Sequence, residues 1–204
     1  MAVSSKVQIC NLALLRLGTN PITSLTEGTT AANACNLVYD HCRESLLRRH
    51  FWNFAIDNVQ LAADSDAPAF KYANKFQLPS DFVRIKEIYE QGSDYDIDGT
   101  AIYTDDGAPL KLSYVKDITD VTKFDSMFTE SLVLMIIIKI GSRIQGDGFN
   151  AAPYLEELQR VSLEAKRVDA QDASPTQWGI NTFTRSRQNT AGDLASIGKS
   201  FMEY

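Results

Sequence analysis

The pattern of apolar and polar positions divides the chain into two helical stretches with an extended stretch between them. Apolar residues recur every three or four positions over 5–17 and again over 30–50, which is the spacing of an amphipathic helix. Ser5 and Thr29 stand where helix N-caps are expected, and Gly18 suits the left-handed residue that ends a helix. We therefore predict two helices in the first fifty residues.

The stretch from 56 to 116 has a different period. Apolar and polar residues alternate over 82–89 and 110–114, as in half-buried strands. Asp98-Gly99 and Asp106-Gly107 are typical of hairpin turns. The pattern predicts a small antiparallel sheet of four or five short strands.

Helical spacing returns after Asp125 and lasts to about 173, over two segments. The first, 126–145, is apolar on all sides at its centre, so we expect it to be the most buried helix. The sequence therefore predicts a mainly α, α+β fold. Residues 1–55 and 125–173 would form a four-helix bundle, 56–124 an inserted small antiparallel β subdomain, and 174–204 a flexible, extended C-terminal arm.

Composition narrows the function. Of the 204 residues 44% are hydrophobic and 23% charged, which indicates a folded globular protein. The net charge of −6 argues against a protein that grips DNA by neutralising phosphates, although not against one that surrounds DNA and lets it slide. No apolar run approaches the ~20 residues needed to cross a membrane, and no secretion signal is evident, so we expect folding in a cytoplasm.

The sequence offers little chemistry. It contains no phosphate-binding glycine loop, zinc-ligand pair or nucleophile elbow. The three cysteines, Cys10, Cys35 and Cys42, are an odd number, which favours small buried side chains over disulfides. The segment Asp94–Gly99 resembles a calcium loop, but Ile102 and Asp105 fall where that loop needs an oxygen ligand and a glutamate, so we interpret it as a hairpin turn. We predict no catalytic residue, metal or cofactor.

A family resemblance runs through the first 175 residues. It is carried by Asn11–Gly18, Pro21–Gly28, Ala31–Ala34, Trp52–Ala55 and the Leu78–Arg84 stretch. This pattern resembles the tail tubular protein A family of short-tailed bacteriophages, the head-to-tail adaptors. Its core positions in this chain are Leu14, Gly18, Tyr39, Arg43, Trp52 and Phe54.

The resemblance implies a structural protein of the virion, located at the head–tail junction. Such adaptors form a dodecameric ring beneath the portal protein, extend the DNA channel without binding DNA specifically, and receive the tail nozzle protein. The resemblance also implies a C-terminal arm that reaches the portal. We expect a monomer in isolation that assembles into a ring on the portal, with no membrane contact. Candidate portal-binding residues are Trp178, Phe183, Arg185 and Arg187.

Two other functions fit the sequence. Some proteins of this family are credited with cell-wall or polysaccharide hydrolysis, which needs two carboxylates about 5–10 Å apart in a cleft. The sequence offers Glu27, Glu44, Glu156 and Glu157 as possible acids. The other alternative is a head-completion protein of a long-tailed phage, which would differ in ring size and tail partner.

Overall fold

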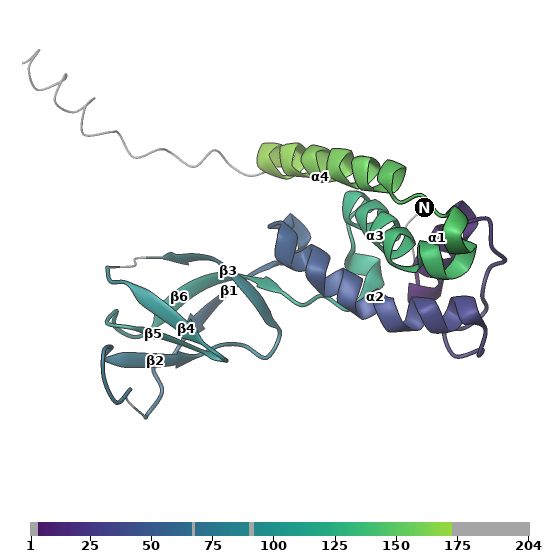
Figure 1. Ribbon diagram of the computed structural model, residues 1–204. Helices are drawn as coiled ribbons and strands as arrows, with labels where there is room; N and C mark the ends of the chain where they lie inside the picture. Colours follow the sequence, from purple (N-terminus) through teal and green to yellow (C-terminus); the bar gives the residue numbers. More distant parts are fainter. Residues whose placement is uncertain (1–3, 67, 90–91, 173–204) are drawn as a thin grey trace, which may run out of the picture. The chain divides into compact units, whose positions relative to one another are not determined.

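Two capped helices begin the chain (Figure 1). The computed structural model describes residues 4–66, 68–89 and 92–172. Helix α1 spans Lys6–Arg16 and α2 spans Thr30–Arg49. Ser5 accepts a hydrogen bond from the Gln8 N–H, and Thr29 accepts one from the Ala32 N–H, which confirms both predicted N-caps. Gly18 follows α1 with φ of 70°, in the left-handed region predicted for it.

The last two described helices differ in burial. Helix α3 spans Ser126–Gln145 and contains an unbroken buried run from Ser131 to Ile137, which confirms that it is the most buried helix among the described residues. It ends at the short 3-10 helix η3, Gly146–Gly148, and α4 follows over Ala152–Asp172. None of the helices in the described ranges is long and apolar enough to cross a membrane.

The segment between α2 and α3 forms two antiparallel sheets, flanked by the short 3-10 helices η1 (Asn53–Ala55) and η2 (Val121–Lys123). The first sheet has the order β1-β6-β3, and the second has the order β2-β5-β4. Residues from both sheets build one apolar cluster, which includes Phe76, Ile102 and Leu112. The strands are β1 (Ile56–Leu61), β2 (Asn74–Gln77), β3 (Phe82–Tyr89), β4 (Tyr95–Asp98), β5 (Ala101–Thr104) and β6 (Leu110–Lys116).

The predicted four-helix bundle with a small inserted β subdomain is wrong. The structure has four helices with six strands in two sheets over its described residues. Helices α1, α2 and α3 share the main apolar core, to which α4 adds the buried Ala165 and the half-buried Tyr154. Leu158 and Val161 of α4 pack in a separate small cluster with Leu134 of α3. The stripe predicted for α4 is narrower than a bundle helix requires, because Leu155 and Val168 each remain 44% exposed.

The predicted single sheet of four or five strands is also corrected to two three-stranded sheets. The division of the chain at 55/56 and 124/125 into a helical and a β part stays a prediction. The predicted arm, residues 174–204, lies outside the described residues.

Candidate functional site

The sequence-predicted site residues fall into two groups. Trp178, Phe183, Arg185 and Arg187 lie outside the described residues. The six residues of the family pattern, by contrast, are all placed: Leu14, Tyr39, Arg43 and Trp52 are buried, Phe54 is half-buried, and Gly18 ends α1. Four of them belong to α2 and to the segment that follows it.

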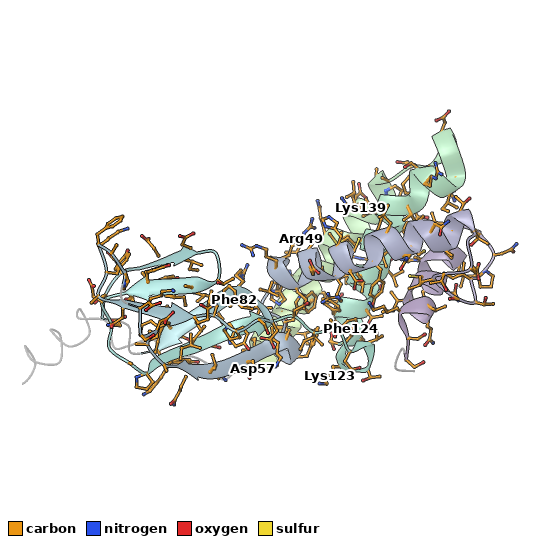
Figure 2. The ribbon with its side chains drawn as sticks, turned by 90° about the horizontal axis from the view of Figure 1, so that it is seen from below. Arg49, Asp57, Phe82, Lys123, Phe124 and Lys139 are labelled. Atoms are coloured by element: carbon orange, nitrogen blue, oxygen red, sulfur yellow. The ribbon has the colours of Figure 1, made fainter. Side chains whose placement is uncertain are left out.

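Trp52 stands at the centre of an aromatic cluster beyond the end of α2. Its ring meets Phe128 edge to face at a centroid distance of 5.1 Å, and Phe54 meets the same Phe128 ring at 5.1 Å. The Trp52 Nε1–H donates to the Leu46 carbonyl oxygen at 3.1 Å, so the indole leaves no unsatisfied donor. Phe124 packs on Phe128 at 4.8 Å (Figure 2). The cluster therefore fixes the exit of α2 against α3.

Arg43 forms a second fixed point, where α2 meets the segment after β6. Its side chain is only 3% exposed, and its guanidinium donates to both oxygens of the Asp117 carboxylate. Arg43 Nη1 also donates to the Ile118 carbonyl oxygen at 3.1 Å. Burial, the largest single effect, lowers the pKa of Arg43, but the hydrogen bonds and the negative charges of Asp117 and Asp40 together outweigh it and raise this pKa. We call Arg43, Asp117 and Ile118 the arginine joint.

A reciprocal pair of arginines ties α2 to β3 close by. Arg48 donates to the Val83 carbonyl oxygen at 2.9 Å, and Arg84 donates to the Arg48 carbonyl oxygen at 2.8 Å. The Arg84 guanidinium also lies 3.7 Å from the centroid of the Phe51 ring. Together with the arginine joint, these contacts hold the first sheet against the helices by directional bonds as well as by apolar packing.

The loop between α1 and α2, which carries much of the family pattern, is held by side chains. Asn11 accepts a hydrogen bond from the Ile22 N–H at 2.8 Å and donates to the Ile22 carbonyl oxygen at 2.9 Å. Glu27 accepts hydrogen bonds from the Thr23 N–H and hydroxyl, each at 2.8 Å, and from the Thr29 hydroxyl at 2.9 Å. The backbone N–H of Thr23, then the Thr23 and Thr29 hydroxyls, lower the pKa of Glu27 from its usual 4.5 to about 2.

This loop should make part of the stability depend on acid pH. A carboxyl whose pKa is lowered by folding stabilises the protein fully above its unfolded pKa, and this stabilisation is lost as the pH falls through the folded value. We therefore expect the Glu27→Gln variant to be less stable than wild type at pH 7 and to approach it between pH 4.5 and about 2. Thermal melts of both proteins across this range test the prediction, and a constant difference would contradict it.

The predicted cysteine and acidic-turn interpretations can be compared with the structure. Cys10, Cys35 and Cys42 are free thiols in the core, which confirms that they are small buried side chains. Asp94–Gly99 forms β4 and the turn into β5, with Gly99 at φ of 59° and Asp96 paired with Lys71, which confirms the hairpin. In the described part of the chain, no group of His, Cys, Asp and Glu is placed to hold a metal ion.

The acids considered for hydrolysis lie on three different segments of the chain. Glu27 lies in the first loop, Glu44 is on α2, and Glu156 and Glu157 are on α4, where Glu157 bonds Arg16 at 2.7 Å. Lys116, Lys75 and Lys71 lower the pKa of Asp57, Asp64 and Asp96, respectively, by donating hydrogen bonds. Among the described carboxyls whose pKa departs from its usual value, the departure is downward, whereas a general acid needs a raised pKa.

Two grooves border the second half of α2. The first, of about 460 Å³, lies between α2 and the β3 side and includes His41, Glu44 and Asp81. Its Asp81 accepts a hydrogen bond from the Tyr114 hydroxyl at 3.0 Å and pairs with Lys116 at 3.2 Å. Arg43 binds Asp117, another lining residue, and pairs with Glu44 at 3.5 Å, so all three carboxylates that line this groove already serve internal contacts.

The second groove, of about 470 Å³, lies between α2 and α4, and we call it the α2–α4 groove. Leu46, Trp52, Leu158 and Leu163 supply its apolar lining. Arg49 and Lys166 supply charge, and its lining contains no carboxylate. A hydrogen bond between His50 Nε2, directly after α2, and Asp169 Oδ2, on α4, links the two helices next to the groove. No local pattern in the sequence predicts this groove, because its two sides are more than a hundred residues apart in the chain.

Comparison with known proteins adds no relative. Neither a scan against protein-family models nor a search of curated proteins found a match to this chain. The function must therefore be argued from the residues themselves.

Proposed function

We propose that this chain is a structural head-to-tail connector subunit of a tailed bacteriophage, without enzymatic activity. In this proposal it forms a dodecameric ring beneath the portal protein, extends the DNA channel and attaches the tail nozzle protein. It would assemble in the host cytoplasm and remain in the virion at the head–tail junction.

The use of the family-pattern residues supports this proposal more than any other observation. Arg43 is buried in the arginine joint, and Trp52 and Phe54 share the aromatic cluster on Phe128. These residues fix helices and sheet to each other, whereas the substrate-binding residues of an enzyme would converge on a cleft. Rigid attachment is what a subunit needs if it must pass force along a channel wall.

The charge of the chain is consistent with a channel. A net charge of −6 repels DNA phosphates, so a ring of such subunits would present DNA with weak, non-specific contacts. Low adhesion favours passage of the genome.

The test is binding to a purified portal ring, imaged by electron microscopy. We expect the full chain to bind as a ring, and a chain lacking 175–204 to stay folded but fail to bind.

Trp178→Ala should weaken binding at least about thirtyfold, the effect of losing an interface anchor worth roughly 2 kcal/mol. Leu37→Ala is the control, because Leu37 is a surface residue on α2 that is 82% exposed. Undiminished binding by the shortened chain would contradict the arm hypothesis, and absence of binding by the full chain would contradict the proposed function.

A further inference from the structure

The α2–α4 groove has the composition of a docking surface. Leu163, which lines the groove together with Leu46, Trp52 and Leu158, is 57% exposed. Arg49 and Lys166 add two positive charges, and no carboxylate lines the groove to neutralise them. A segment that combines apolar and acidic side chains would match both properties.

A further cation extends the positive charge of this flank. Burial raises the pKa of the Cys42 thiol to about 11, and Lys139 and Arg49 oppose this rise, so both cations act on the same buried site. Figure 2 shows the two side chains on one flank of α2 and α3. The positive potential therefore extends from α2 onto α3.

The described chain itself offers an acidic and apolar segment in β4. This strand lies at the edge of its sheet, and all four of its residues are exposed. Ile97 is 47% exposed and Tyr95 is 37% exposed, and they alternate with Asp96 and Asp98. Asp94 directly precedes the strand, and Asp96 is paired with Lys71, so Asp94 and Asp98 supply most of its negative charge. An edge strand with exposed apolar side chains is a ready site for pairing with another molecule.

Charge decides how two copies can meet through these surfaces. Two β4 strands side by side would oppose aspartates, and two α2–α4 grooves face to face would oppose Arg49 and Lys166. Both symmetric arrangements are therefore repulsive, whereas β4 against the groove pairs opposite charges and buries apolar side chains of both copies. Only the unlike pairing is favoured.

We propose that β4 of one copy docks in the α2–α4 groove of the next, head to tail. Such a heterologous contact leaves a free groove at one end and a free strand at the other, so it propagates, and it forms a ring when the rotation between neighbouring subunits closes. This inference rests on the proposed function, because it names the contact through which connector subunits would meet. A single strand in a groove buries little area, so the contact is weak in solution and becomes effective when a template concentrates the subunits.

Site-specific crosslinking tests the contact. Ile97→Cys and Leu163→Cys replace exposed residues, and the natural cysteines are buried, so each variant presents one accessible thiol. The two variants are mixed at high concentration with a short bis-maleimide, and heterodimers are quantified by mass spectrometry. Leu37→Cys replaces Leu163→Cys in the control, because Leu37 is 82% exposed and reacts at least as readily in random collisions. We expect the 97–163 heterodimer to exceed the 97–37 heterodimer about tenfold, corresponding to roughly 1.4 kcal/mol.

Charge reversal makes the test specific. Arg49→Glu with Lys166→Glu in the Leu163→Cys protein should reduce the crosslink to the control level. Adding Asp94→Lys with Asp98→Lys to the Ile97→Cys protein should restore it, because the signs are then exchanged on both sides. Circular dichroism and melting curves of each variant establish that it is folded. Equal yields for the 97–163 and 97–37 pairs would overturn the proposed contact. A 97–163 yield that charge reversal does not change would overturn it as well.

The outcome separates this contact from the proposed function. Rings on the portal without the 97–163 crosslink would keep the connector proposal and overturn the contact. The crosslink without portal binding would keep the contact as a self-association surface and overturn the connector proposal.

Discussion

Replacing Arg43 with methionine should destabilise the protein by about 3 kcal/mol, the scale on which removing one partner of a buried ion pair acts. The substitution leaves the Asp117 carboxylate without its cation and the Ile118 carbonyl oxygen without the Arg43 donor. A larger loss of stability is not expected, because the Asp117 side chain is 29% exposed and water can solvate part of its charge. Urea unfolding followed by circular dichroism measures the difference.

Two further variants make the Arg43 measurement specific. Arg49→Met changes the same residue type on the same helix at an exposed position, and it should change stability by no more than about 0.5 kcal/mol. Adding Asp117→Asn to Arg43→Met removes the stranded charge and should recover about 1 kcal/mol or more. If Arg43→Met and Arg49→Met have the same free energy of unfolding, the arginine joint stabilises the protein no more than an exposed arginine does.

The second large effect is expected for Trp52→Ala, which should cost about 3–5 kcal/mol. The side chain is only 2% exposed, so its removal leaves a cavity against Phe128 and Leu46 and loses the hydrogen bond to the Leu46 carbonyl oxygen. Equilibrium unfolding in guanidinium chloride provides the measurement. Trp52→Phe retains a ring and should lose less, so equal losses for the two variants would argue that packing on Phe128 is unimportant.

Local sequence signals predicted the helices well. The helix ends are set by Ser5, Thr29 and Gly18, which act on the backbone of their immediate neighbours. Their roles can therefore be predicted from a few adjacent residues. The same holds for the β4–β5 hairpin, whose turn is set by Gly99.

The arrangement of the elements was much less predictable. Helical periodicity indicates that α4 has an apolar face but not how much of that face is covered, and the bundle prediction failed on this point. Alternation likewise does not identify strand partners, so the pairing of β1 with β6 and the separation into two sheets could not be inferred. The position of Arg43 in the C-terminal half of a helix indicates by itself only a favourable interaction with the helix dipole. Its partner Asp117 lies 74 residues away, and no local pattern connects them.

Strand β1 pairs with β6 along its whole length, with Ile56 opposite Val115 and Leu61 opposite Leu110. The chain consequently leaves the helices through β1 and returns to them through β6, and these two strands are neighbours in one sheet. Changes of length in the second sheet, β2-β5-β4, can be absorbed without displacing α2 or α3, because β1 and β6 stay adjacent and β3 keeps its contacts with α2. The second sheet is thus the part of the β region whose loops can change in length while the helices keep their packing.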